Sequence, residues 1–185
     1  MYSNSIEQLI QEFKKLPTVG QKTAERFVFK LLKSGKKQVG ELTLALKKMS
    51  VDVKSCEKCW DFSDSTPCQV CSNTERNHKT LCIVAESQDK QAIEKTKEFN
   101  GIYFILRGVI QPDQENLKYT KIKELVTKLK QDKVINEILL AFNPDMNGET
   151  TMMYLEKQIK TLNPQIKITR LARGLPMNSD LQYAD

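Results

Sequence analysis

Four of the five cysteines lie close together, in the arrangement Cys56-x2-Cys59-x8-Cys68-x2-Cys71. A tight turn through each Cys-x2-Cys pair can aim both sulfurs at one point. Two facing turns then supply the tetrahedral four-thiolate shell that Zn²⁺ prefers in structural sites. A catalytic zinc would keep one coordination position open, whereas four protein ligands are present here. The spacing therefore predicts one structural zinc ion in a small zinc finger over residues 55–73.

Two other uses of paired cysteines are disulfide bonds and redox chemistry. Disulfides require an oxidising compartment, and Met1 to Ile10 lacks the charged and apolar regions of a secretory signal. Two redox motifs this close together, without a thioredoxin-like setting, would be unusual. The longest apolar runs, such as residues 138–142, are too short to cross a bilayer. We therefore expect a cytoplasmic protein whose thiols bind zinc.

Positive charge is concentrated in the N-terminal third of the chain. Residues 1–59 carry twelve Lys or Arg and six Asp or Glu, which accounts for the whole net charge of +6. A general bias toward Lys would spread the excess positive charge evenly along the chain, whereas here it lies in one third. Such localisation is typical of a nucleic-acid-binding surface.

The same third contains a pattern for two helices joined by a tight hairpin. Apolar residues recur at helical spacing in residues 5–15, and a second helix begins after the break Leu16-Pro-Thr-Val-Gly20. Gly20 would let a ligand approach the backbone, and the free amides that follow favour a phosphate. Lys22 and Arg26, four residues apart, would neutralise neighbouring phosphates without reading base sequence. We expect Val19, Gly20, Lys22 and Arg26 to contact DNA; an ordinary helical hairpin is the alternative.

A loop over residues 34–37 and a third helix over residues 39–54 should follow. Leu42, Leu46 and Met49 form an apolar stripe on this helix, which we interpret as core packing. After the cysteines, Trp60 and Phe62 should pack over the metal or against a neighbouring element, because a small zinc module has little core of its own.

The C-terminal part alternates short apolar runs with amphipathic ones. Strands are expected over residues 81–85, 102–106, 134–142 and 166–171, and helices over residues 90–99, 117–131 and 149–162. This alternation predicts an α/β domain with a mostly parallel sheet covered by helices. His78 lies in a polar loop and should be solvated, and Cys82 should be a small buried apolar residue. The sequence contains no Ser-His-Asp set and no Gly-rich nucleotide-binding loop.

In this order the parts resemble the bacterial RecR family of recombination proteins. The resemblance runs nearly end to end and includes the hairpin, the zinc spacing and a C-terminal signature at residues 179–185. Thr18 and Gln21 stand where the family hairpin usually has Gly and often Pro. Residues 92–94, 101–103 and 143–151 are similar to the family's Toprim domain.

Membership would imply a DNA-binding protein that assembles as ring-shaped oligomers and works with RecO and RecF. Together these proteins help to load recombinase onto gaps coated by single-strand-binding protein. The resemblance also implies four parts: a helical DNA-binding region (1–54), the zinc finger (55–73), a Toprim-like domain (79–175) and a C-terminal segment (176–185).

Toprim enzymes hold Mg²⁺ with acidic residues at two strand ends, and here that set is depleted. Ala85 takes the position of the first Glu, with Glu86 one residue late, and Asn147 replaces another acid, leaving Asp145 and Glu149. Hard cations need several converging oxygens. We therefore expect no catalytic residues, with Glu86, Asp145 and Glu149 serving as a vestigial or partner-binding acidic site. The alternatives are a Mg²⁺-dependent Toprim nuclease or primase, and a zinc adaptor that binds only proteins.

Overall fold

We describe residues 2–111, 120–172 and 174 from a computed structural model of the chain. They form two compact units, Met1–Val53 and Lys54–Asp185. The expected C-terminal segment 176–185 and the start of the helix expected from residue 117 lie outside the described residues. No helix in the described part is long and apolar enough to span a membrane.

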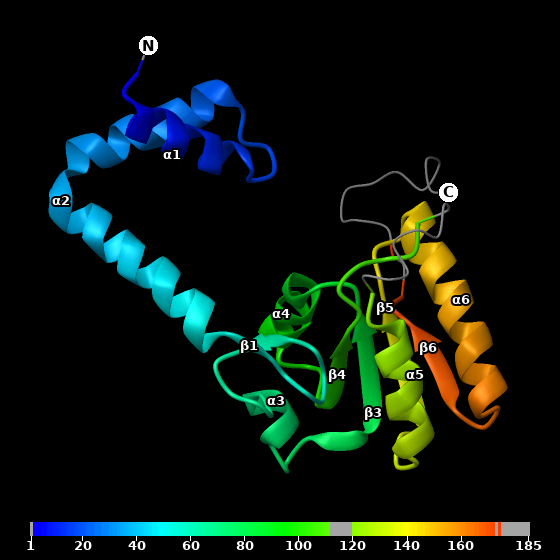
Figure 1. Cartoon of the computed structure of the whole chain (residues 1–185). Helices are drawn as coiled ribbons and strands as arrows, with labels where there is room; N and C mark the ends of the chain where they lie inside the picture. The colour runs from blue at the N-terminus through cyan, green and yellow to red at the C-terminus, as the bar shows by residue number, and fades with distance from the viewer. Residues whose placement is uncertain (1, 112–119, 173, 175–185) are drawn as a thin grey trace. The chain divides into compact units, whose positions relative to one another are not determined.

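The first unit consists of two helices, α1 (Asn4–Lys14) and α2 (Gln21–Asp52) (Figure 1). Ile10 of α1 packs against Ala24 and Val28 of α2, and all three side chains are buried. The apolar spacing in residues 5–15 and at the start of the second helix thus predicts the contact correctly. This small core positions the connection between the helices.

Helix α2 bends once, at Gly35, where a loop was expected over residues 34–37. Gly35 has φ 85° and ψ 164°, so the helix is broken at this single residue and continues directly after it. Glycine adopts this left-handed φ without the clash that a Cβ would cause. A glycine can therefore kink a helix without a longer linker.

The prediction that the apolar stripe after this bend is core packing is wrong. Leu42, Leu46 and Met49 are 39%, 54% and 58% exposed. A two-helix unit buries residues only where its helices meet, and α1 is too short to reach the second half of α2. The stripe is therefore an uncovered apolar surface of the described chain.

The second unit is built on a four-stranded sheet in the order β4-β3-β5-β6, with every neighbouring pair parallel. Its strands are β3 (Asn77–Val84), β4 (Gly101–Ile105), β5 (Glu137–Ala141) and β6 (Lys167–Arg170). The expected parallel sheet is confirmed. In β3, Leu81 and Ile83 face one apolar cluster while Cys82 and Val84 face the other. Burial on both faces explains the continuous apolar run.

Helices cover the two faces of this sheet (Figure 1). The larger cluster includes residues of α5 (Ile122–Gln131) and α6 (Met146–Leu162), and the smaller one includes Ile93 of α4 (Ser87–Thr96). Helices α4 and α6 begin three residues earlier than expected. A capping box between Glu86 and Asp89 begins α4, and Asp145 caps α6.

The cysteine segment belongs to the second unit. It contains the antiparallel pair β1 (Lys54–Ser55) and β2 (Phe62–Ser63) and the short helix α3 (Gln69–Ser72). Val70 of α3 packs on the smaller cluster of the sheet. Trp60 packs, half-buried, on the larger one, as expected for an aromatic that docks the zinc module on a neighbour.

A tight turn connects β5 to α6. The Asp145 carboxylate accepts a hydrogen bond from the Gly148 amide at 2.7 Å. A Cβ on Gly148 would lie 2.0 Å from the carbonyl oxygen of Asn143, so only glycine fits. One turn further on, the buried Thr151 hydroxyl accepts from the Ile110 amide at 2.8 Å and donates to the Asn147 carbonyl. These contacts fix the carboxyl-terminal ends of β4 and β5 relative to α6.

Candidate metal centre and nucleic-acid interface

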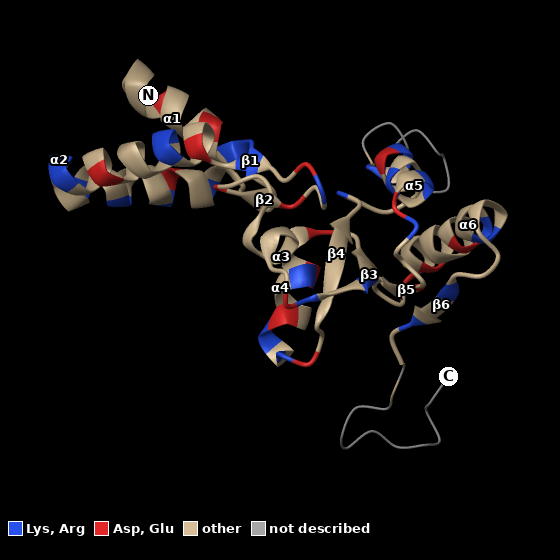
Figure 2. Ribbon diagram, turned by 90° about the horizontal axis from the view of Figure 1, so that it is seen from below, with Lys and Arg blue, Asp and Glu red and all other residues tan. Residues whose placement is uncertain are grey.

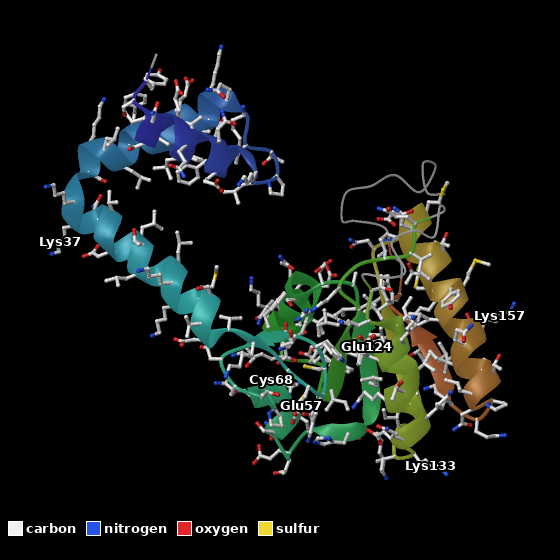
Figure 3. The ribbon with its side chains drawn as sticks, in the orientation of Figure 1. Lys37, Glu57, Cys68, Glu124, Lys133 and Lys157 are labelled. Atoms are coloured by element: carbon white, nitrogen blue, oxygen red, sulfur yellow. The ribbon has the colours of Figure 1, made fainter. Side chains whose placement is uncertain are left out.

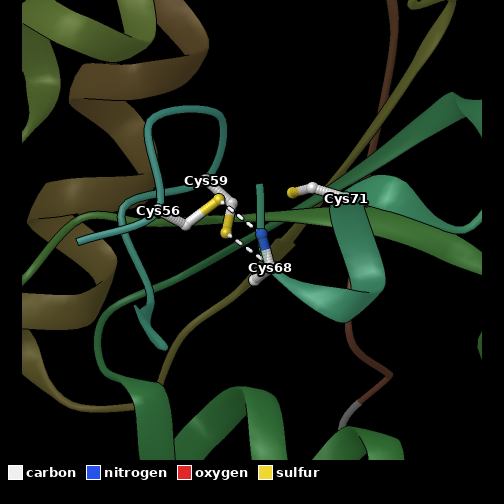
Figure 4. Close-up of side chains that lie close together, drawn as sticks. All are labelled: Cys56, Cys59, Cys68 and Cys71. Carbon is white, nitrogen blue, oxygen red and sulfur yellow. Dashed lines mark hydrogen bonds between the residues drawn. The ribbon is translucent and has the colours of Figure 1, made fainter. Parts of the chain in front are cut away.

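The four predicted zinc ligands come together at one point (Figure 4). The sulfur atoms of Cys56, Cys59, Cys68 and Cys71 all lie within 4.8 Å of one another, and all four side chains are buried. The Cys59 and Cys68 sulfurs are 3.6 Å apart, and the Cys68 amide donates to the Cys56 sulfur at 3.3 Å. Within the described residues, this is the one cluster of three or more side chains whose ligand atoms converge for a metal ion.

Local backbone turns aim these sulfurs. The Trp60 amide donates to the Cys56 carbonyl at 2.9 Å, and the Cys56 amide donates to the Asp61 carbonyl at 2.8 Å. This closed turn requires Trp60 to adopt a left-handed conformation, with φ 65°. The second pair is held by the start of α3, where the Ser72 amide donates to the Cys68 carbonyl. The sequence therefore forms two knuckles that present one pair of sulfurs each.

The electrostatics of the cluster favour a bound cation. Hydrogen bonding to the Cys68 and Cys71 thiols, together with burial, raises the pKa of Cys59. The same contact with Cys59 lowers the pKa of Cys68. Several negative charges cannot be buried together without compensation. A soft divalent cation supplies that compensation and matches the all-thiolate donor set.

Asp61 and Lys90 attach the cysteine segment to the α/β part of the unit, and neither was singled out from the sequence. The Lys90 ammonium contacts the Asp61 carboxylate at 2.6 Å, and Ser87 donates to the same carboxylate at 2.6 Å. The Ile105 amide of β4 also donates to the Cys59 carbonyl at 2.8 Å. A lysine inside a polar helix carries no sequence signal for burial. Only the tertiary contact shows its role.

The hairpin of the first unit has the expected form. Gly20 precedes α2 with extended backbone (φ −83°, ψ 176°), and a Cβ placed on it would have no atom within 4 Å. Thr18 has a left-handed backbone, with φ 66°. Glycine adopts this conformation more freely than threonine does. The Val19 amide donates to the Leu16 carbonyl at 3.2 Å and closes the turn.

The two cations expected to contact DNA lie beside this turn. Lys22 and Arg26 are both exposed, and neither forms an ion pair with any described residue. Arg26 lies over the ring of Phe27, at 6.0 Å from its centroid. Lys and Arg recur along α2 in Figure 2, whereas α1 carries one Lys, at its end. The hairpin therefore presents free positive charge next to the open amides at the start of α2.

The three acidic residues are each engaged in local structure. Glu86 and Asp145 occupy the N-cap positions of α4 and α6. Glu149, in the first turn of α6, lies 3.5 Å from Arg170. Burial and the charge of Asp89 raise the pKa of Glu86, while Arg107 opposes the rise. These carboxylates are not among the described side chains that converge as potential metal ligands.

The two remaining expectations concern single residues. His78 is exposed, and its Nε2 lies 3.0 Å from the Asn73 carbonyl oxygen, so the ring is outside the cysteine cluster. Cys82 is fully buried in β3, and burial raises the pKa of its thiol to about 12. Both predictions are confirmed.

A helical hairpin, a four-cysteine cluster and a parallel α/β sheet together define a mixed α and α/β protein with a candidate metal centre. The model of the RecR helix-hairpin-helix matches residues 6–50, and the model of the Toprim domain matches residues 79–172. The chain is 41% identical over 185 residues to the recombination protein RecR of two strains of Clostridium perfringens, covering all of this chain and 91% of each relative. The chain belongs to the RecR family.

Proposed function

We propose that this protein is a non-enzymatic, DNA-binding recombination mediator of recombinational repair. It acts in the cytoplasm with RecO-like and RecF-like proteins to load recombinase on gapped or single-stranded DNA. Family membership supports the role in recombination. The observation that carries the DNA contact is the hairpin, where exposed Lys22 and Arg26 flank a helix start open to a ligand.

The hairpin suits a phosphate for two reasons. The first amides of α2 have no acceptor within the helix, and Gly20 offers no side chain to cap them. Lys22 and Arg26 lie four residues apart, so both charges project from the same face of the helix. Contacts of this kind hold the DNA backbone and carry no base specificity. Binding should therefore be independent of sequence and sensitive to salt.

The cysteine centre is assigned to one structural Zn²⁺. Its four buried sulfurs lie within 4.8 Å of one another. They would complete the tetrahedral shell that zinc prefers and leave no position for a substrate. Reduced thiols of this kind suit a reducing compartment. Bound zinc would fix the two knuckles and through them the docking of Asp61 on Lys90.

The same proposal includes self-association and protein partners. The uncovered stripe of Leu42, Leu46 and Met49 favours a homo-oligomer, a dimer or a tetrameric ring, in which a second copy covers these side chains. In the Toprim domain, Glu86, Asp145 and Glu149 serve structure rather than a Mg²⁺ site. This supports a scaffold for protein partners over a nuclease or primase.

The test is the double variant Lys22→Ala with Arg26→Ala, compared with Lys47→Ala with Lys48→Ala. Both variants remove two exposed positive charges from α2. We expect only the hairpin variant to lose DNA retention, with a salt slope shallower by about 2 and unchanged zinc content. Equal loss in both variants would show that only net charge matters. Mg²⁺-dependent nicking by the pure protein, lost in Glu149→Gln, would establish the enzymatic alternative.

A further inference from the structure

Two aromatic rings and two cations alternate on the surface where the zinc module meets the sheet. The Arg107 guanidinium carbon lies 4.3 Å from the centroid of the Phe62 ring and 6.0 Å from that of Trp60. The Lys121 ammonium lies 4.2 Å from the centroid of the Trp60 ring. Phe62 is 58% exposed. We call these four residues the aromatic platform.

Arg107 is held in place by the zinc module. Its Nε donates to the Trp60 carbonyl at 3.1 Å, and its Nη2 donates to the Ser55 hydroxyl at 2.7 Å. Its Nη1 has no acceptor among the described residues. Arg107 also has a left-handed backbone, with φ 59°. The guanidinium is therefore fixed against the Phe62 ring and keeps one nitrogen for a ligand.

The backbone at Trp60 suggests that its side chain has a use beyond the knuckle. The left-handed φ of 65° closes the turn between the first two cysteines. Glycine would adopt it freely, whereas a bulky residue costs about 1 kcal/mol there. Part of the ring packs on the core, and the residue is only half-buried. The strained position thus holds a large aromatic at the surface.

A cavity of about 700 Å³ opens beside Trp60. The zinc module and α5 line its two sides, marked by Glu57 and Glu124 in Figure 3, and the edge strand β4 lines it as well. Arg107 follows β4 at its carboxyl end, where ligands of parallel sheets commonly bind. Of the four platform residues, Trp60 alone lines this cavity, so the cavity adjoins the platform at the Trp60 side chain.

The charges around the platform favour a base over a phosphate. Lys121 is paired with Glu124 at 2.9 Å. Arg107 is held by a carbonyl and a hydroxyl, and its guanidinium lies against the Phe62 ring. Because Glu124 balances the Lys121 charge and Arg107 is turned to the ring, the site offers a stacking surface rather than a cluster of free cations. Aromatic faces and stacked guanidinium groups instead bind the π-face of an uncharged base.

We infer that the aromatic platform of Trp60, Phe62, Arg107 and Lys121 is a second nucleic-acid contact that stacks an unpaired base of single-stranded DNA. This inference rests on the proposed function, because it takes DNA as the ligand. The hairpin contacts the phosphate backbone, which both single-stranded and duplex DNA present. The platform requires an unstacked base, which only single-stranded DNA offers. The two sites together would favour gapped over duplex DNA.

The chain contains one tryptophan, so fluorescence reports this site directly. The experiment titrates the full-length protein with labelled oligo-dT and with an abasic oligomer of the same length. Label anisotropy measures binding, and Trp60 emission measures stacking. We expect oligo-dT to quench Trp60 and to bind about tenfold more tightly than the abasic oligomer. Phe62→Leu should remove that preference, and Phe62→Tyr should keep it.

The outcomes separate the two proposals. The double variant Lys22→Ala with Arg26→Ala should weaken the binding of oligo-dT and of the abasic oligonucleotide equally. The preference for the oligonucleotide that carries bases should remain. Binding of both oligomers with equal affinity and equal Trp60 emission would overturn the platform and leave the hairpin assignment standing. Failure of both oligomers to bind at any salt concentration would overturn the DNA-binding proposal and the platform with it. Zinc content and circular dichroism check that Phe62→Leu is folded.

Discussion

The Lys90 ammonium and the Asp61 carboxylate form a buried ion pair, 2.6 Å apart, between α4 and the segment that carries the cysteines. Each side chain is 7% exposed. Burial alone would lower the pKa of Lys90, but the hydrogen bond and charge of Asp61 raise it above its usual value. The positive charge also lies near the Cys68 and Cys59 thiols. The pair therefore neutralises charge at the junction while fixing its geometry.

Lys90→Met should destabilise the second unit by about 3 kcal/mol, because it leaves the Asp61 carboxylate buried without a counter-charge. Urea unfolding followed by Trp60 fluorescence measures the change, since the single tryptophan lies in this unit. Lys167→Met removes a lysine of the same unit whose side chain is 69% exposed in its ion pair with Glu137. This control should change stability by less than about 1 kcal/mol. A small effect of Lys90→Met would mean that water solvates Asp61.

The sequence predicts the parts of this fold better than their relation to one another. Alternating apolar runs predict four strands and the parallel sheet, because both faces of a strand such as β3 are buried. The order β4-β3-β5-β6 depends on which strands pair, and no local pattern encodes it. The starts of α4 and α6 were predicted too late in the sequence. Their N-cap residues, Glu86 and Asp145, come before the first apolar residue of each helix, so apolar spacing does not mark the start.

In the candidate sites, too, local features were predicted from the sequence and tertiary contacts were not. The cysteine spacing correctly predicts that four sulfurs converge, since all four cysteines lie in one short segment. Asp61 and Lys90 were missed because the two residues are distant in sequence. The stripe on α2 was taken for core because periodicity shows that a face is apolar and does not show what covers it.

Cys56→Ser or Cys71→Ser should lower both the zinc content and the melting temperature, because the bound metal supplies much of the folding energy of this segment. Metal analysis by mass spectrometry and thermal unfolding measure the two effects. Cys82→Ala provides the matched control, since this fifth cysteine is buried in β3 and lies outside the cluster. It should retain a full complement of zinc. A Cys56→Ser protein that loses zinc yet melts at the same temperature would contradict the structural role.

Gly148→Ala should destabilise the second unit by about 2–3 kcal/mol, because the added Cβ would lie 2.0 Å from the Asn143 carbonyl oxygen. The backbone must move to relieve this clash, and the Asp145 cap moves with it. Gly40→Ala is the control, because a Cβ there meets nothing within 4 Å and α2 gains helix propensity. Chemical unfolding should show the loss only for Gly148→Ala. Equal stability of the two variants would show that the turn accommodates a side chain.

Leu46→Lys with Met49→Lys should reduce the molecular mass of the protein in solution. The two side chains are 54% and 58% exposed, so lysine is tolerated in the isolated helix and disfavours an apolar interface. Light scattering with and without DNA measures the assembly, and circular dichroism confirms that α2 is intact. Lys47→Gln with Lys48→Gln changes neighbouring exposed residues without touching the stripe and should leave the mass unchanged. An unchanged mass in the Leu46 and Met49 variant would show that assembly uses another surface.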